Sequence, residues 1–406
     1  MSRNENTFEA GACQRGAIGA EPGREHGQTI GMARRTLLLG GIVSASVLLG
    51  QMVKAQSVAQ AATVGAAPEK SPALINHTFT SPRHTTHYWE AGSADGPLMI
   101  FVHGWPEIGL MWRTQVEAFA AQGWRCVAPD MRGYGGSSAP IAAKAYALEE
   151  IVQDMVELHD HLGGHPAIWV GHDLGSPVIG ALAAHHPERS RGVVFTSVPY
   201  SPESFALPSL VPLVDRKLYP ADQYPDGQWD YYRFYLTHFD RTVTDFDEDI
   251  PATLSAIYRR GSPEVVGKIY PSATITSRGG WFGPAHRAPG VPPDTALWPP
   301  ADFDALVAAF RTTGFRPGNS WYLNDAANIA YAHMAPGGGH LKQPVLFVNG
   351  KWDAICDITR ARLGDPMRST CHDLSVTSLP AGHWLPLERK TELTEAIRSW
   401  LKIKGL

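Results

Sequence analysis

The sequence lacks the features of a nucleic-acid-binding, repetitive or multi-span membrane protein. Its 35 lysine and arginine residues are outnumbered by 39 aspartate and glutamate residues, so the formal net charge is −4, and no basic cluster is interleaved with aromatic residues. No internal repeat is visible, and beyond residue 50 no apolar run is long enough to span a bilayer. With 44% hydrophobic and 18% charged residues, the chain of 406 residues is long enough for one catalytic domain and an inserted module.

The first 66 residues have the composition of a leader and a signal peptide. Residues 1–31 are polar and glycine-rich, which predicts disorder. Arg34 and Arg35 then precede an apolar run of about 14 residues, and residues 59–61 (AQA) resemble a cleavage site. Because paired arginines before a short apolar run resemble a twin-arginine export signal, we expect a periplasmic or extracellular protein with no stable membrane insertion after cleavage.

Two features of this leader stay open. The apolar run is a membrane anchor if it is not cleaved, although it falls short of the roughly 20 residues that a spanning helix needs. Met32, which lies just before the paired arginines, is a second candidate for the start of the chain.

Cysteine is scarce, with four residues in the whole chain. Cys13 would be removed with the leader, and Cys126 lies in an apolar run typical of a buried thiol. Cys356 and Cys371 remain. Because an exported protein can keep a disulfide, we hypothesise a bridge between these two residues, with a pair of free thiols as the alternative.

From residue 78 the sequence alternates between short β-rich runs and helical stretches, which predicts an α/β domain with a mostly parallel sheet. The runs 99–102 and 168–170 are continuously apolar, as in strands that are covered on both faces. We expect helices over residues 148–162, 177–186 and 390–401. The expected strands are 85–89, 98–102, 125–129, 167–170, 193–198, 345–349 and 374–379.

The alternation stops between residues 201 and 341. This segment is rich in aromatic residues, proline and glycine, has helical patches such as 302–312, and contains a stretch at 279–300 that predicts a loop. The strand and helix pattern then resumes. We therefore expect a core formed by residues 78–200 and 342–406, with residues 201–341 inserted as a cap over the carboxyl edge of the sheet, where α/β folds place their sites.

The segment 171–175 (GHDLG) carries the strongest chemical signal. It lies directly after an expected strand and directly before an expected helix, as in a nucleophile elbow, with Asp173 where esterases have serine. The flanking glycines allow the close backbone packing that such a strained turn needs. An aspartate in the nucleophile's own position has no separate nucleophile to deprotonate as a general base. We therefore interpret Asp173 itself as a nucleophile that forms an ester. A plain helix N-cap is the structural alternative.

Two partners follow in the order that the fold requires, acid and then histidine. Asp353 lies just past the expected strand 345–349, and His383 lies between the last expected strand and the last helix. Both are therefore expected at the same sheet edge as Asp173. Asp357 competes for the role of the acid, but Asp353 is closer to the strand end.

A third turn at this edge is predicted by residues 103–106 (HGWP), directly after the strand 98–102. Gly104 permits close approach of the backbone. The backbone N–H groups of Trp105 and Leu174 would form an oxyanion hole with two donors. We interpret His103 itself as a buried packing group.

These segments together look like the epoxide hydrolase family of the α/β-hydrolase fold, in the branch with an aspartate nucleophile. The similarity covers roughly residues 78–402, the whole expected mature domain. The segments that carry it are 103–107 (HGWPE), 130–138 (DMRGYGGSS), 171–175 (GHDLG) and 382–384 (GHW).

The resemblance extends to two tyrosines of the cap. Residues 314–322 (GFRPGNSWY) are similar to the family's second cap-tyrosine segment and place Tyr322 in that role. Residues 230–235 (DYYRFY) resemble the first. Tyr232 fits the spacing best, while Tyr231 and Tyr235 stay open.

The resemblance implies a hydrolase acting on ether bonds, which converts a small apolar epoxide and water into a vicinal diol. Asp173 would attack a ring carbon while the two tyrosines protonate the oxygen. His383, oriented by Asp353, would then activate water to hydrolyse the ester. No cofactor is implied, and no histidine or cysteine spacing near these residues indicates a metal site. The chain would act as a monomer or a homodimer.

A haloalkane or haloacetate dehalogenase is the main alternative, because it would use the same three residues. The first usually has an aromatic N–H donor directly after the nucleophile, and the second an arginine nearby. This sequence has Leu174 there and no arginine before Arg189. Leu174 also departs from the many epoxide hydrolases with tryptophan, which bears on substrate preference. No G-x-S-x-G supports an esterase, and a non-catalytic binder has no need of the complete set.

Overall fold

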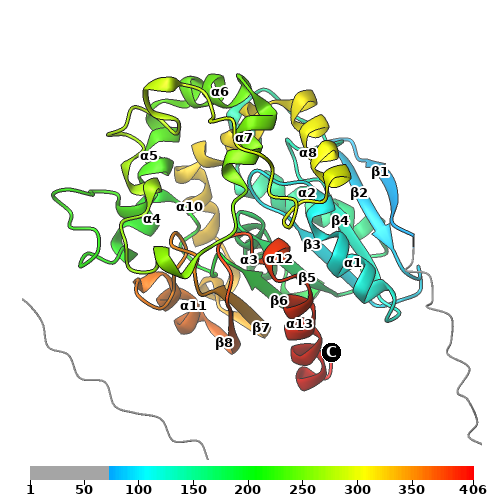
Figure 1. Ribbon diagram of the computed structural model, residues 1–406. Helices are drawn as coiled ribbons and strands as arrows, with labels where there is room; N and C mark the ends of the chain where they lie inside the picture. Colours follow the sequence, from blue (N-terminus) through cyan, green and yellow to red (C-terminus); the bar gives the residue numbers. More distant parts are fainter. Residues whose placement is uncertain (1–72) are drawn as a thin grey trace, which may run out of the picture. The chain divides into compact units, whose positions relative to one another are not determined.

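The computed structural model describes residues 73–406, so the expected leader, its signal peptide and Cys13 lie outside the described residues. Within that range, no helix combines the length and the apolar character needed to cross a membrane. The described chain forms one sheet with helices on both of its faces and further helices over one edge (Figure 1).

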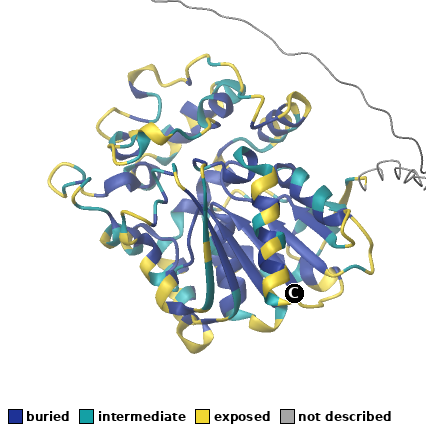
Figure 2. Cartoon of the chain, turned by 60° about the horizontal axis from the view of Figure 1, so that its bottom comes forward, coloured by how far each residue is buried: buried dark blue, intermediate teal, exposed yellow. Residues whose placement is uncertain are grey.

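Eight strands form this sheet in the order β1-β2-β4-β3-β5-β6-β7-β8. Neighbours from β4 to β8 are parallel, and β2 is antiparallel to both β1 and β4. Every residue of β3 and β5 is buried, which confirms the expectation from their apolar runs (Figure 2). The strands are β1 Ile75–Thr80, β2 Thr85–Ala91, β3 Leu98–Val102, β4 Arg125–Pro129, β5 Ala167–His172, β6 Ser190–Thr196, β7 Leu341–Gly350 and β8 Cys371–Leu379.

Strand β1 is the strand that the sequence pattern did not predict. Its residues (INHTFT) show no regular alternation of apolar and polar side chains, and all but Phe79 are exposed. The strand pairs only with β2, at the edge of the sheet. An exposed edge strand needs no buried face, so it leaves little periodic signal in the sequence.

Helices of the core cover both faces of the sheet. Helix α1 packs with α13 on one face and α2 packs with α3 on the other (Figure 1). The expected helices 148–162, 177–186 and 390–401 correspond to α2, α3 and α13. The core helices are α1 Arg113–Ala120, α2 Leu148–His161, α3 Gly175–His185, α11 Asp365–Thr370, α12 Leu385–Glu388 and α13 Lys390–Lys404.

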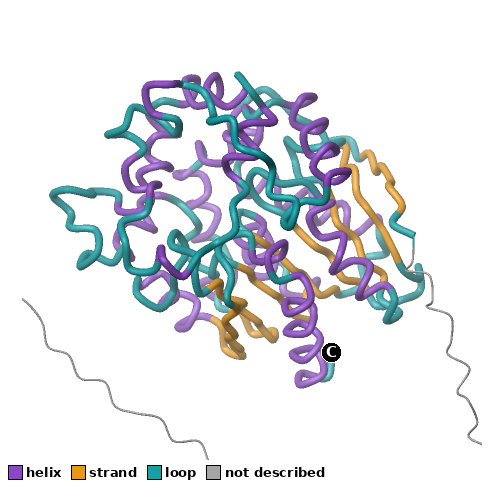
Figure 3. The backbone as a smooth tube through the Cα atoms, viewed as in Figure 1, coloured by secondary structure: helices purple, strands orange, loops and turns teal. Residues whose placement is uncertain are grey.

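Among the described residues, the segment between β6 and β7 contains helices and loops but no strand. It lies over the carboxyl edge of the sheet (Figure 1). Between α7 and α8 it is mostly loop (Figure 3). The expected loop 279–300 contains the helical turn Gly283–Ala285, and its last residue is the first residue of α8. The cap helices are α4 Leu207–Leu210, α5 Asp230–Thr237, α6 Phe239–Asp247, α7 Ile250–Ile257, α8 Pro300–Thr313, α9 Arg316–Asn319 and α10 Asp325–His333.

The hypothesised bridge between Cys356 and Cys371 is wrong. Cys126, Cys356 and Cys371 are all free and buried. Cys371 begins β8, whereas Cys356 follows the carboxyl end of β7, and these two strands are parallel. A strand of nine residues at about 3.3 Å per residue therefore separates the two thiols, far more than the roughly 6 Å between Cα atoms that a disulfide spans.

Candidate active site

The turn between β5 and α3 presents Asp173 at the carboxyl edge of the sheet. Asp173 has a φ of 49°, a conformation that L residues rarely adopt and that tight packing maintains. The packing is visible at Gly175, where an added Cβ would lie 2.3 Å from the carbonyl oxygen of Val102. The elbow expected from the sequence is thus present as a strained turn against strand β3.

One oxygen of the Asp173 carboxylate is held and the other is available. The backbone N–H of Trp105 donates to Oδ1 at 2.7 Å. The backbone nitrogen of Leu174 lies beside Gly104, as Oδ1 does. At Gly104 an added Cβ would lie 2.5 Å from both Oδ1 and the Leu174 nitrogen, so this approach requires glycine. Burial raises the pKa of Asp173, but the hydrogen bond and charge of His383 outweigh it and bring the pKa below its ordinary value.

His383 lies between two carboxylates. Its Nε2 is 3.3 Å from Asp173 Oδ2, and its Nδ1 donates to Asp353 Oδ2 at 2.9 Å. The other oxygen of Asp353 accepts from the backbone N–H groups of Ile355 and Cys356, each at 3.0 Å. Burial lowers the pKa of His383, yet Asp353 and Asp173 more than offset this and leave it well above its ordinary value.

The competing acid, Asp357, does not contact this histidine. Its carboxylate accepts from the backbone N–H of Thr359 at 2.7 Å, in a turn of its own loop. The structure therefore brings together Asp173, His383 and Asp353, and leaves Asp357 outside.

A buried pair beneath the turn, His172 and Glu107, holds the backbone of His383, and reasoning from the sequence missed it. His172 contacts Glu107 Oε1 through Nδ1 at 2.7 Å and the carbonyl oxygen of His383 through Nε2 at 2.8 Å. Glu107 Oε2 in turn accepts from the N–H of Gly104 at 2.5 Å. The sequence did carry a signal for this pair, because Glu107 in HGWPE and His172 in GHDLG are ionisable residues next to apolar strands, where a buried group needs a partner.

A cavity of about 820 Å³ lies between these residues and the cap. Asp173 and His383 form part of its wall on the sheet side, and Tyr231, Trp281 and Tyr322 line it from the cap. Its lining is predominantly apolar, which suits an organic substrate, and it includes the four arginines Arg259, Arg260, Arg278 and Arg287.

The cap tyrosines divide into two groups. Tyr231 and Tyr322 line the cavity with Asp173, and their rings are edge to face with centroids 6.0 Å apart. Burial raises the pKa of both phenols well above the ordinary value. The charge of Asp173 adds to this effect at Tyr231, and Tyr231 and Asp173 add to it at Tyr322. Both are therefore neutral hydroxyl donors at neutral pH.

The expectation for Tyr232 is wrong, because its hydroxyl donates to Asp325 and lies away from the Asp173 cavity. The reason is the rotation of α5, in which neighbouring residues point about 100° apart. Tyr231 and Tyr235 share one face at the spacing of four residues. Tyr235 lies on that face but its buried hydroxyl has no partner and does not line the cavity. Tyr231 thus occupies the position at the cavity that we expected for Tyr232.

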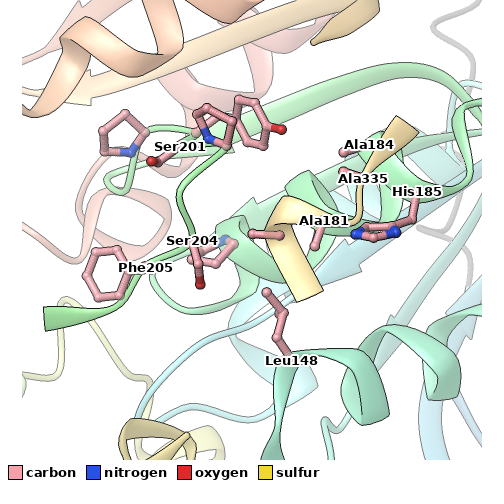
Figure 4. Close-up of a pocket in the computed structure, with 13 residues that line it drawn as sticks. Leu148, Ala181, Ala184, His185, Ser201, Ser204, Phe205 and Ala335 are labelled. Atoms are coloured by element: carbon pink, nitrogen blue, oxygen red, sulfur yellow. The ribbon is translucent and has the colours of Figure 1, made fainter. Parts of the chain in front are cut away.

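A second hollow lies beside α3 and holds none of these residues. It encloses only about 20 Å³, room for about one water molecule. Its lining includes Leu148, Ala181 and Phe205 (Figure 4), and its histidine, His185, is stacked on Tyr331 at a centroid distance of 3.8 Å. It has no constellation that could carry out chemistry.

Known proteins are similar to this chain in sequence and in fold. A profile of the alpha/beta hydrolase fold family matches residues 97–245. Epoxide hydrolase A of Mycobacterium tuberculosis is 31% identical over 321 residues, which cover 77% of this chain and 92% of that protein. The chain belongs to the epoxide hydrolase family. It is thus a member of a family of hydrolases that act on ether bonds.

One further sequence relative and one solved structure are also similar to this chain. Bifunctional epoxide hydrolase 2 of Sus scrofa is 26% identical across 82% of this chain, which spans only 56% of that longer protein. The solved structure of an epoxide hydrolase from an endophytic Streptomyces is 28% identical, with a TM-score of 0.66 over 82% of this chain and 96% of that one. The α/β-hydrolase fold expected from the sequence is confirmed.

Proposed function

We propose that this protein hydrolyses an epoxide to a vicinal diol through an ester on Asp173. The observation that carries the proposal is the meeting of two buried phenols, Tyr231 and Tyr322, with Asp173 and His383 around one apolar cavity. A carboxylate nucleophile opposite two neutral hydroxyl donors is what the opening of a strained ether needs. The epoxide hydrolase relatives support the same activity.

In the first half-reaction, Oδ2 of Asp173 attacks a ring carbon and the carbon–oxygen bond of the epoxide breaks. Oδ1 stays with the Trp105 N–H, so the nucleophile enters with one oxygen already oriented. The departing oxygen would be a poor leaving group as an alkoxide, and it takes a proton from Tyr231 or Tyr322. The product is a hydroxyalkyl ester of Asp173.

In the second half-reaction, His383 takes a proton from water and the resulting hydroxide attacks the ester carbonyl. Loss of the Asp173 charge on ester formation removes one of the two carboxylates that raise the pKa of His383, so this pKa falls and the neutral ring, the form that can take a proton from water, is favoured at this step. The N–H groups of Trp105 and Leu174 stabilise the oxyanion. One proton of the water ends on the second hydroxyl of the diol, and the other restores the tyrosine.

The dehalogenase alternative gains no support from the geometry around Asp173. The indole N–H of Trp105 donates to Asn319 Oδ1 at 2.9 Å, and the side chain of Leu174 has no donor. A departing halide would therefore lack the paired N–H donors beside the nucleophile, whereas an epoxide oxygen would meet the tyrosine hydroxyls.

A single turnover in water enriched in oxygen-18 tests the ester. With styrene oxide or an aliphatic epoxide as substrate, we expect the label to enter the Asp173 carboxylate, because hydroxide adds to its carbonyl. Peptide mass spectrometry locates the label. The same measurement is made on Tyr231→Phe, which removes a proposed proton donor, with Tyr232→Phe as its matched control. Label found only in the diol would contradict the ester. Release of halide from bromoalkanes without diol from epoxides would move the assignment to a dehalogenase.

We also propose that the chain is exported. The support is the pair Arg34 and Arg35 ahead of a short apolar run. Changing both to lysine should leave the protein in the cytoplasmic fraction of a bacterial host, while the unchanged chain is found outside it. Equal distribution of the two chains would contradict export by this signal.

A further inference from the structure

The thiol of Cys356 lies beside the His383 and Asp353 pair and has no part in the proposed reaction. One ligand atom from each of the three residues lies within 4.8 Å of the other two. The backbone N–H of Cys356 donates to Asp353 Oδ1 at 3.0 Å, which holds the loop in place. All three residues also line the large cavity, so a small solute can reach them from the substrate side.

On its own this thiol is a poor nucleophile. Burial, and to a smaller extent the charge of Asp353, raise the pKa of Cys356 to about 12, so it is protonated at neutral pH. A divalent cation changes this, because a coordinating thiol releases its proton and binds as the thiolate. The carboxylate and the imidazole that lie within 4.8 Å of this thiol are further metal ligands, so the geometry favours a metal ion over an organic electrophile as its ligand.

The three donors suit one class of cation. A thiolate sulfur, an imidazole nitrogen and a carboxylate oxygen are ligands of four-coordinate zinc and related thiophilic ions, whereas magnesium and calcium prefer oxygen alone. In a tetrahedral zinc site with bonds of about 2.0–2.3 Å, neighbouring ligand atoms are about 3.5 Å apart. Small side-chain rotations would close the remaining gaps, and a fourth position stays open for water.

We propose that Asp353, Cys356 and His383 bind a thiophilic divalent cation such as Zn²⁺ or Cd²⁺, which reversibly blocks ester hydrolysis. The cation replaces the thiol proton, which goes to solvent, and takes a nitrogen lone pair of His383. A second proton leaves if the imidazole is protonated beforehand. With that lone pair engaged, His383 no longer takes a proton from water. The inhibition rests on the proposed function, but the binding does not.

Cadmium titration followed by the ultraviolet sulfur-to-cadmium charge-transfer absorbance tests the binding. The full chain carries Cys13→Ser, which removes the thiol outside the described residues. We expect one equivalent to produce the band, and the same band with Cys371→Ser. Cys356→Ser and Cys356→Ala should both abolish it. A band that survives in both Cys356 variants, or is lost with Cys371→Ser, overturns the proposal. Because absorbance needs no turnover, this result is independent of epoxide hydrolysis.

The inhibition is measured separately, as diol formation with Zn²⁺ before and after addition of a chelator. We expect reversible inhibition, with an inhibition constant at least about tenfold higher in Cys356→Ser. Loss of a residue that only hydrogen-bonds to a metal ligand already weakens metal binding by about this factor, and loss of a ligand itself should weaken it at least as much. Cys371→Ser should be inhibited like the unchanged chain. Quenched samples of the inhibited enzyme should contain the Asp173 ester. Equal inhibition of Cys356→Ser and the unchanged chain overturns the inhibitory part.

Discussion

The two sides of the cavity are held by different means. On the sheet side, Asp173, Asp353 and His383 each follow the carboxyl end of a strand, and the parallel ladder fixes their spacing. On the cap side, Tyr231 and Tyr322 are placed by the packing of aromatic rings on short helices. A position set by strand order can be read from the sequence directly. A position set by helix rotation depends on the phase of the helix, and an error of one residue turns the side chain by about 100°.

Removing the nucleophile should give the largest effect on the sheet side. We expect Asp173→Ala to lower kcat by at least about 10⁴-fold, because no other group can form the ester. Mass spectrometry of quenched, intact protein should show the ester in the unchanged chain and none in the variant. Diol formation by Asp173→Ala at a comparable rate would refute the assignment.

On the cap side, substitution of the tyrosines one at a time tests the helix phase. We expect Tyr231→Phe and Tyr322→Phe each to lower kcat/KM by about 10²-fold, since each removes a proton donor to the departing oxygen. Tyr232→Phe should keep kcat/KM within about threefold. Steady-state diol formation measures all three.

The same Tyr232→Phe variant should instead lose stability. Asp325, which is half-buried and also accepts from the backbone N–H of Leu207, would lose its phenol donor, and the loss of that hydrogen bond costs about 1 kcal/mol. Urea unfolding followed by circular dichroism measures the difference. A Tyr232→Phe variant that is slower than Tyr231→Phe would restore the assignment made from the sequence and remove the contrast between the two sides.

Lower pH should separate the two half-reactions. The pKa of Asp173 lies below its ordinary value, so the carboxylate stays ionised and forms the ester as the pH falls. In the ester the Asp173 charge is lost but Asp353 still raises the pKa of His383, and below that pKa the protonated ring cannot accept a proton from water. We therefore expect the ester to accumulate as the pH falls from about 8 to about 5, detected by quenched mass spectrometry. A constant fraction of ester across this range would contradict these roles.

A smaller effect on turnover than at Asp173, Tyr231 or Tyr322 is expected at Glu107, which lies below the turn that carries Asp173. Glu107→Gln removes a buried charge that supports both His172 and the N–H of Gly104. We expect the free energy of unfolding to fall by about 1–3 kcal/mol, because an amide has one accepting oxygen and leaves one of the two buried contacts unmade, while kcat falls by no more than about tenfold. Denaturant unfolding and diol assays measure the two. A loss of kcat as large as that of Asp173→Ala would give Glu107 a direct role.

Much of the fold and the core of the site could be predicted because their signals are local. Buried parallel strands appear as continuous apolar runs, and the carboxyl ends of those runs indicate where Asp173, Asp353 and His383 should lie. Strand β1 escaped prediction because its exposed position imposes no apolar pattern.

The parts that could not be predicted depend on contacts between distant segments. Asp353 and Cys356 are three residues apart, but both approach His383 only because the loops after β7 and β8 are neighbours, so the complete set of ligands has no spacing along the chain. The separation of Cys356 from Cys371 likewise follows from the direction of β8. The phase of α5 is decided by Asp325, nearly a hundred residues beyond Tyr232, which takes the hydroxyl of that tyrosine.

The insertion of the cap between β6 and β7 also governs how the chain reaches its folded state. Val193 of β6 lies beside Val345 of β7, a pairing that closes a loop of about 150 residues. Contacts so far apart in sequence form slowly. Until they form, β6 has an unpaired edge that can associate with another chain. Refolding yield should therefore fall as protein concentration rises, with the β6 edge as the point of aggregation.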